Sequence, residues 1–122
     1  MKALVVDDSR AMRLLIGRIL REAGFEVAEA GHGREAIDRL TSSSDTDLVL
    51  VDWNMPEMDG IEFVRTVRAN RAFDGLRVMM VTTECDMEKV IDALHAGADD
   101  YVMKPFTRDV LMEKLSLLGV GA

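Results

Sequence analysis

The stretch ALVVDD, residues 3–8, places four apolar residues directly before two aspartates. Three further segments end in the same way, with a polar or charged group after an apolar run: LVLV before Asp52, VMMV before Thr82, and YVM before Lys104 and Pro105. Short, continuous apolar runs are typical of strands that are buried on both faces of a parallel sheet. Ligands of such sheets bind outside the carboxyl ends of the strands, so we expect these polar groups to converge on one crevice.

The composition is that of one globular domain, residues 1–122, and we expect no effector domain. Hydrophobic residues make up 48% of the chain and charged residues 30%, yet no apolar run approaches the roughly 20 residues that span a membrane. The net charge of −7 argues against nucleic-acid binding, which needs clustered lysine and arginine. Cys85 is the only cysteine, which excludes an internal disulfide, and the expected compartment is the cytoplasm.

Five strands alternating with five helices form the predicted fold. The segments 26–30 and 99–104 are more polar than the three continuous runs, so they suit the edges of a sheet. These positions are those of a flavodoxin-like, doubly wound α/β fold with strand order 2-1-3-4-5. Right-handed crossovers then place helices on both faces of the sheet.

Apolar periodicity and capping residues locate the helices. The inward stripes are predicted at Met12, Leu15, Ile16, Ile19 and Leu20; at Ala36, Ile37 and Leu40; at Ile61, Val64 and Val67; at Met87, Val90, Ile91 and Leu94; and at Leu111, Leu115 and Leu118. The expected N-caps are Ser9 or Asp8, Asp59 and Thr107. Gly24 and Gly97 are expected to end helices in the left-handed conformation, and a loop at 41–45 to close the second helix.

Three carboxylates in one crevice predict a cation site. Asp7, Asp8 and Asp52 repel one another there, so either one pKa rises or a cation is bound. A small set of hard oxygen ligands suits Mg²⁺ better than zinc. A carboxylate is also a competent nucleophile toward phosphorus. The ammonium group of Lys104 and the hydroxyl of Thr82 supply the charge and the hydrogen bond that phosphoryl transfer needs.

Five blocks of sequence together resemble the receiver domain of bacterial two-component response regulators. They are Asp7-Asp8, DWNMP at 52–56, Asp59-Gly60, Val81-Thr82 and KPF at 104–106. The resemblance covers nearly the whole chain and is nearest to the single-domain, CheY-like chemotaxis receivers. It implies a signalling phosphoprotein that is not an enzyme in the usual sense, because it catalyses only its own phosphorylation and dephosphorylation.

The resemblance also assigns roles to individual residues. It implies that Asp52 accepts a phosphoryl group from a histidine kinase in the presence of Mg²⁺, with Thr82 and Lys104 assisting. The implied metal ligands are Asp7, Asp8, Asp52 and the backbone carbonyl of Asn54. The implied switch pair is Thr82 and Tyr101, the implied tuning positions are Asn54, Thr83 and Glu84, and the bond between Lys104 and Pro105 is expected to be cis.

The output implied by the resemblance is binding of a downstream protein, in chemotaxis or a related pathway. The face expected to bind it is formed by the fourth helix, the fifth strand and the fifth helix. The candidate contacts on that face are Lys89, Asp92, His95, Tyr101, Arg108 and Met112.

Four other functions are left open by the sequence. The chain is alternatively a phosphate sink or relay receiver, or a receiver cut from a longer DNA-binding regulator. A haloacid-dehalogenase-type phosphatase also uses an aspartyl nucleophile, but it requires Asp-x-Asp after the first strand, where this chain has Asp7-Asp8-Ser9. A flavodoxin-like FMN carrier shares the strand order, but the carboxylates at 7 and 8 would repel its phosphate group.

Overall fold

The computed structural model describes residues 1–122 except 44, 54, 56–57, 84–86 and 121–122, and only the backbone at 83 and 87. Five parallel strands form one sheet in the order β2-β1-β3-β4-β5, as predicted. The strands are β1 (Lys2–Val6), β2 (Glu26–Ala30), β3 (Leu48–Asp52), β4 (Arg77–Thr83) and β5 (Asp100–Lys104). The helices are α1 (Arg10–Glu22), α2 (Gly33–Ser42), α3 (Gly60–Arg68), α4 (Met87–Ala96) and α5 (Arg108–Leu117), with a short 3-10 helix at Arg71–Phe73.

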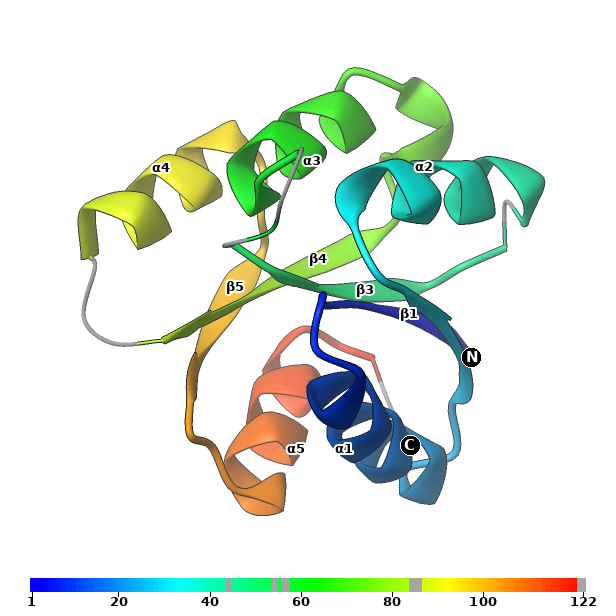
Figure 1. The fold of residues 1–122 in the computed structure, drawn as a ribbon, viewed down its shortest axis with the longest axis vertical. Coiled ribbons are helices and arrows are strands. Elements are labelled where there is room, and N and C mark those ends of the chain that lie inside the picture. The colour runs from blue at the N-terminus through cyan, green and yellow to red at the C-terminus, as the bar shows by residue number, and fades with distance from the viewer. Residues whose placement is uncertain (44, 54, 56–57, 84–86, 121–122) are drawn as a thin grey trace.

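The sheet lies between two layers of helices, with α1 and α5 on one face and α2, α3 and α4 on the other (Figure 1). Alternate residues of β1 enter different cores: Leu4 and Val6 pack beneath α2–α4, whereas Ala3 and Val5 pack against α1 and α5. Every residue of the central strand β3 is buried. The inner strands need nonpolar side chains on both faces, and the apolar runs therefore mark them in the sequence.

Three residues that were predicted to face inward are exposed instead. Leu15, Ile91 and Leu94 retain 51%, 46% and 36% of their accessible surface. On α1 the buried stripe is narrower than predicted and includes Gly17. Among the α4 side chains that the structure describes, which exclude Met87, only Val90 and Ala93 are buried, because this helix covers the margin of the sheet at β4 and β5 and not its centre.

The capping predictions for three helices are confirmed. The side chains of Ser9, Asp59 and Thr107 accept hydrogen bonds from the amides of Met12, Glu62 and Val110. Gly24 and Gly97 adopt φ angles of +96° and +122°, and the bond between Lys104 and Pro105 is cis. Helix α2 differs from the prediction, because it extends to Ser42 and its N-cap is His32, whose Nδ1 accepts from the Glu35 amide.

Arg68, at the end of α3, ties together the turns at the amino ends of β4 and β5. Its guanidinium group donates to the carbonyl oxygens of Gly97, Phe73 and Leu76 and to the carboxylate of Asp99, at 2.8 to 3.0 Å. Asp99 in turn accepts from the amide of Val78 at 2.8 Å. A Cβ atom at position 97 would lie 2.5 Å from Cγ of Arg68, so the close approach requires glycine there.

We predict that Arg68→Met lowers the free energy of unfolding by about 2 to 4 kcal/mol, because four acceptors lose a charged, largely buried donor. Arg65→Met, an exposed position on the same helix, is the matched control and should change stability by less than about 0.5 kcal/mol. Urea unfolding followed by tryptophan fluorescence measures both variants. Equal stability of the two variants would contradict this account of Arg68.

Candidate functional site

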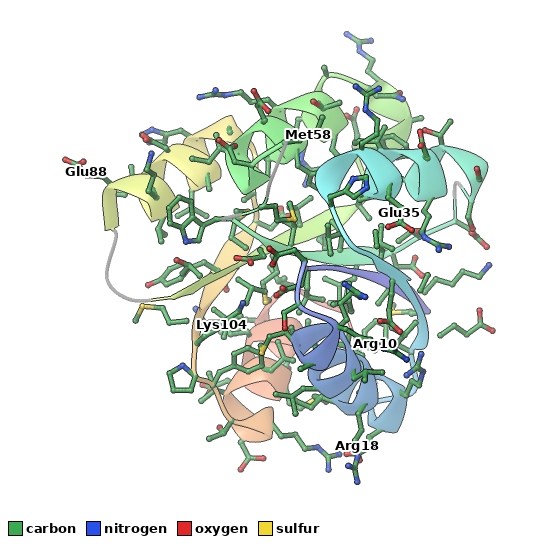
Figure 2. All side chains as sticks on the ribbon, viewed as in Figure 1. Arg10, Arg18, Glu35, Met58, Glu88 and Lys104 are labelled. Carbon is green, nitrogen blue, oxygen red and sulfur yellow. The ribbon has the colours of Figure 1, made fainter. Side chains whose placement is uncertain are left out.

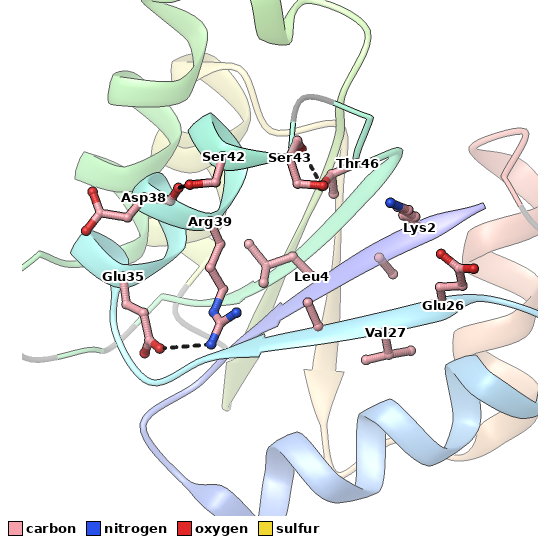
Figure 3. A pocket seen from close by; sticks show the side chains of 12 residues that line it. Lys2, Leu4, Glu26, Val27, Glu35, Asp38, Arg39, Ser42, Ser43 and Thr46 are labelled. Atoms are coloured by element: carbon pink, nitrogen blue, oxygen red, sulfur yellow. Dashed lines mark hydrogen bonds and ion pairs between the residues drawn. The ribbon is translucent and has the colours of Figure 1, made fainter.

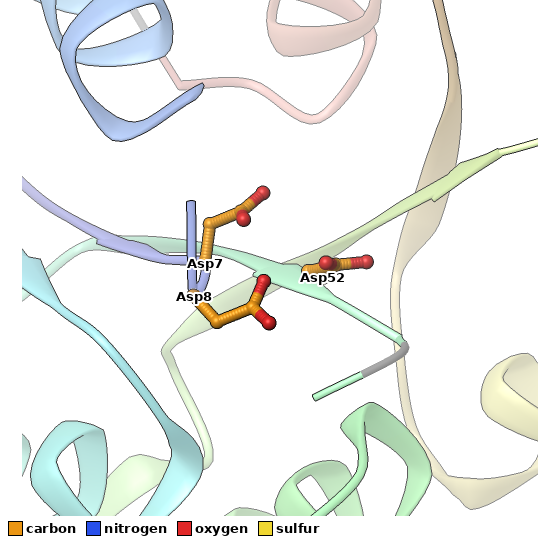
Figure 4. A group of neighbouring side chains, drawn as sticks. All are labelled: Asp7, Asp8 and Asp52. Atoms are coloured by element: carbon orange, nitrogen blue, oxygen red, sulfur yellow. The ribbon is translucent and has the colours of Figure 1, made fainter. Parts of the chain in front are cut away.

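Three carboxylates gather at the carboxyl ends of β1 and β3 (Figure 4). Oxygen atoms of Asp7, Asp8 and Asp52 all lie within 4.8 Å of one another. Asp7 and Asp52 are only 2% and 8% exposed, whereas Asp8 is exposed to solvent. Two buried carboxylates therefore share the crevice with one that solvent reaches.

The register of the sheet brings these carboxylates together. Val6 pairs with Val51, so Asp7 and Asp52 follow at the same level of adjacent strands. Val6 and Val51 face α2–α4, and because side chains alternate along a strand, Asp7 and Asp52 turn toward the face covered by α1 and α5. Lys104 lies two residues after Val102, which belongs to the same face.

Lys104 supplies a positive charge to the crevice. Its Nζ atom lies 3.0 Å from Oδ2 of Asp7 and 3.8 Å from Oδ2 of Asp52, and its side chain is only 15% exposed (Figure 2). The other oxygen of Asp7 accepts a hydrogen bond from the amide of Ser9 at 2.8 Å. Lys104 thus offsets part of the repulsion among the carboxylates, a role that the sequence reasoning did not assign to it.

The donor set fits Mg²⁺. All three side chains offer hard oxygen ligands, and the exposed Asp8 leaves one side open to water, which Mg²⁺ retains in proteins. The three carboxylate oxygens lie within 4.8 Å of one another, so a single Mg²⁺ ion could be held by all three residues. The fourth predicted ligand, Asn54, lies outside the described residues, so the complete ligand set stays a prediction.

The two residues of the predicted switch lie on the opposite face of the sheet from Asp52 and Lys104. Thr82 is 1% exposed and follows Val81, the residue of β4 that pairs with Asp52. Tyr101 on β5 is half-buried against the core beneath α2–α4 and pairs with Met80, two residues before Thr82. Alternation places Thr82 on that same face.

The predicted tuning positions are described only in part. Thr83 is the last residue of β4 and pairs with Lys104, but its side chain lies outside the described part of the structure. Glu84 and Asn54 lie outside it entirely. Their roles, and the switch roles of Thr82 and Tyr101, stay predictions.

Trp53 connects the crevice to α4, which the sequence reasoning missed. Its backbone follows Asp52, donates to Val81 and accepts from Gly60. The Nζ atom of Lys89, in the first turn of α4, lies 5.8 Å from the centroid of the indole ring, within the range of a cation–π contact. A lysine on α4 therefore touches the residue next to Asp52.

A separate groove of about 560 Å³ lies between α2 and β2 and shares no residue with the carboxylate cluster (Figure 3). Ala28 forms part of its floor, so the small side chains of the edge strand leave this space open. Glu35 is paired with Arg39 at 3.4 Å on its rim. The hydrogen bond from the Gly31 amide, aided by Arg39, holds the pKa of Glu35 below its usual range. These groups are thus satisfied within the chain, and the groove adds nothing to the carboxylate site.

The predicted partner face is formed by α4, β5 and α5. Of its candidate contacts, Lys89, Asp92, His95 and Arg108 are exposed, and Tyr101 and Met112 are half-buried. The same elements expose large apolar side chains that the prediction did not include: Ile91, Leu94, Met103, Val110 and Leu117. These three elements therefore expose both charged and apolar side chains, although Arg108 pairs with Glu22 of α1 at 2.9 Å.

Comparison with known proteins identifies the family. The model of the response regulator receiver domain matches residues 3–116. The chain belongs to this family. It is 49% identical over 124 residues to the chemotaxis protein CheY homolog of Campylobacter jejuni, covering 100% of this chain and 95% of that protein. It is 48% identical over 119 residues to the chemotaxis protein CheY1 of Helicobacter pylori, covering 97% and 96%.

Comparison with solved structures supports the same family. Vibrio cholerae CheY4 matches with a TM-score of 0.89 at 36% identity, over 95% of this chain and 96% of that one. The chain is therefore a receiver domain of the chemotaxis response regulator type, as the sequence predicted, and such domains are signalling proteins and not enzymes in the usual sense. No helix among the described residues is both long and apolar enough to cross a membrane.

We predict that Lys104→Met binds Mg²⁺ roughly tenfold more tightly, because the ammonium group that competes with the ion for Asp7 and Asp52 is gone. Titration with Mg²⁺ followed by Trp53 fluorescence measures the affinity. Lys2→Met, at the far end of β1 from Asp7, is the matched control and should bind Mg²⁺ as the unmodified protein does. An unchanged or weaker affinity of Lys104→Met would show that its charge does not act on the site.

Proposed function

We propose that this receiver is a phosphorylation-dependent switch. Asp52 accepts a phosphoryl group from a histidine kinase with Mg²⁺, and the face of α4, β5 and α5 then binds a downstream protein, in chemotaxis or related signalling. The observation that supports this is the pairing of three clustered carboxylates with the Lys104 ammonium, 3.8 Å from Asp52. These groups are the nucleophile, the metal ligands and the cation that phosphoryl transfer requires.

The chemistry proposed for Asp52 is an in-line displacement at phosphorus. One carboxylate oxygen of Asp52 forms the new bond to phosphorus as the bond to the histidine nitrogen of the donor breaks. Mg²⁺, when bound, neutralises charge on the transferred group. Lys104 contacts Asp7 more closely than Asp52, at 3.0 Å against 3.8 Å, and we propose that it moves to a phosphoryl oxygen once Asp52 is modified.

The response proposed for the rest of the domain begins at Thr82. The phosphoryl group adds roughly 1.5 to 2 negative charges and three acceptor oxygens, which draw the Thr82 hydroxyl toward Asp52. Because Thr82 and Tyr101 share one face of the sheet, the space that Thr82 leaves is available to the Tyr101 ring. A downstream protein that contacts the two states differently then favours one of them, and by reciprocity it favours phosphorylation.

We predict that Asp52 is the only residue modified when the protein is treated with acetyl phosphate and Mg²⁺. Asp52→Asn keeps the shape of the side chain but removes the nucleophile, so the modification should be lost. Asp59→Asn is the matched control, because asparagine also caps a helix and position 59 lies outside the cluster. Mass spectrometry of the intact protein and its peptides locates the label. A label on serine or histidine would refute the assignment.

We predict that Thr82→Ala is still modified at Asp52 but no longer transmits the change, because the hydroxyl that contacts the phosphoryl group is absent. Thr82→Ser keeps the hydroxyl and is the matched control. Backbone NMR shifts on adding beryllofluoride, a phosphoryl mimic, should reach residues 88–112 in the unmodified protein and in Thr82→Ser. Full shifts in Thr82→Ala would exclude this route. Shifts confined to the Asp52 crevice in the unmodified protein would instead favour a passive phosphate sink.

A further inference from the structure

Lys114 on α5 contacts both Tyr101 and its neighbour Asp100. The Nζ atom of Lys114 lies 4.6 Å from the centroid of the Tyr101 ring, well within the range of a cation–π contact. The same atom lies 3.2 Å from Oδ1 of Asp100. One ammonium group is therefore held by an aromatic face and a carboxylate that are adjacent in the sequence.

The path of the Lys114 side chain crosses the edge of the sheet. Helix α5 packs through Leu111 and Leu115 on the α1–α5 face, whereas Tyr101 packs against the core beneath α2–α4. β5 is the last strand of the sheet, so a long side chain can pass around it from one face to the other. Lys114 thereby links α5 to a ring on the opposite face.

Asp100 fixes the ammonium group in this position. Its Oδ1 atom accepts from Lys114 and also, at 2.8 Å, from the amide of Tyr101. The side chains of Lys114 and Asp100 are only 28% and 22% exposed, so solvent screens their attraction less than it does at an open surface. The cation is therefore held at the ring by a carboxylate that is itself anchored to the backbone of the ring residue.

We propose that Lys114 is the positioning residue that makes α5 follow the Tyr101 ring. When the ring turns, the Lys114 ammonium group either keeps its contact and shifts α5, or loses the contact and lets α5 repack. In both cases a movement of the ring changes the position of α5 on the opposite face of the sheet. This inference rests on the proposed function, in which phosphorylation of Asp52 moves Tyr101.

The chain provides a separate probe for each step. Trp53 is the only tryptophan and lies beside Asp52, and Tyr101 is the only tyrosine. Tryptophan fluorescence therefore reports occupancy of the crevice, and 3-fluorotyrosine gives one ¹⁹F NMR line that reports the ring. Backbone amides of residues 112–117 report α5.

The first experiment compares variants without any phosphoryl mimic. Lys114→Met keeps the aliphatic stem but removes the charge, so the ¹⁹F line should shift and the ring should reorient about fivefold more readily, the factor expected for losing a cation–π contact. Lys114→Arg keeps a cation that stacks on aromatic rings and should restore the line. Asp109→Asn removes a charge from an exposed position of the same helix and should leave the line unchanged. An unchanged line in Lys114→Met would overturn the proposal.

The second experiment adds beryllofluoride and Mg²⁺. In the unmodified protein, in Lys114→Arg and in Asp109→Asn, the tryptophan fluorescence, the ¹⁹F line and the α5 amides should all respond. In Lys114→Met the tryptophan fluorescence and the ¹⁹F line should still respond, whereas the response of the α5 amides should be lost. A full α5 response in Lys114→Met overturns the link, whereas no fluorescence response in the unmodified protein refutes the proposed function.

A second variant covers the case in which Lys114→Met does not fold. Asp100→Asn retains an acceptor for the Tyr101 amide but removes the charge that holds Lys114, so it should shift the ¹⁹F line in the same direction by a smaller amount. A line identical to that of the unmodified protein would overturn the role of this ion pair.

Discussion

The charge balance at the carboxyl edge of the sheet is the constraint on which the rest of the structure depends. Asp7 and Asp52 are almost fully buried, and two buried carboxylates cost several kcal/mol each unless they are paired. Lys104 pairs with both carboxylates. It comes from β5, an edge strand that β3 and β4 separate from β1. The geometry of the site therefore depends on the register of the sheet from β1 through β3 and β4 to β5.

Side-chain alternation divides the site into two halves. The groups that handle charge, Asp7, Asp52 and Lys104, turn toward the face of α1 and α5, whereas Thr82 and Tyr101 belong to the face of α2–α4. The adjacent strands β3 and β4 each carry one group of these two kinds, because Thr82 directly follows Val81, the partner of Asp52. In the proposed switch, a change of charge at Asp52 would therefore need to displace only Thr82 to reach the other face of the sheet.

The fold was predictable from the sequence because each local signal agreed with the others. Continuous apolar runs marked the inner strands, and Ser9, Asp59 and Thr107 marked helix starts whose caps depend on neighbours three residues away. Leu15 and Ile91 were assigned wrongly, because periodicity gives the direction of a helical stripe but not how much sheet lies beneath it. Contacts across long sequence separations, such as those of Lys104 with Asp7 or Arg68 with Gly97, have no signal in a single sequence. The strand-end pattern placed Lys104 at the crevice but did not give its pairing with Asp7.

The contacts that hold the helices differ in stiffness. Arg68 fixes the carboxyl end of α4 through a planar group with four acceptors, a geometry that tolerates little rotation. Among the described contacts, the first turn of α4 meets Trp53 through the single ammonium group of Lys89, and α5 meets Tyr101 through that of Lys114. A point charge over a ring constrains distance but leaves orientation free. The guanidinium contacts at the amino ends of β4 and β5 thus restrict orientation more than the ammonium contacts beside Trp53 and Tyr101 do, a difference that suits the proposed switch.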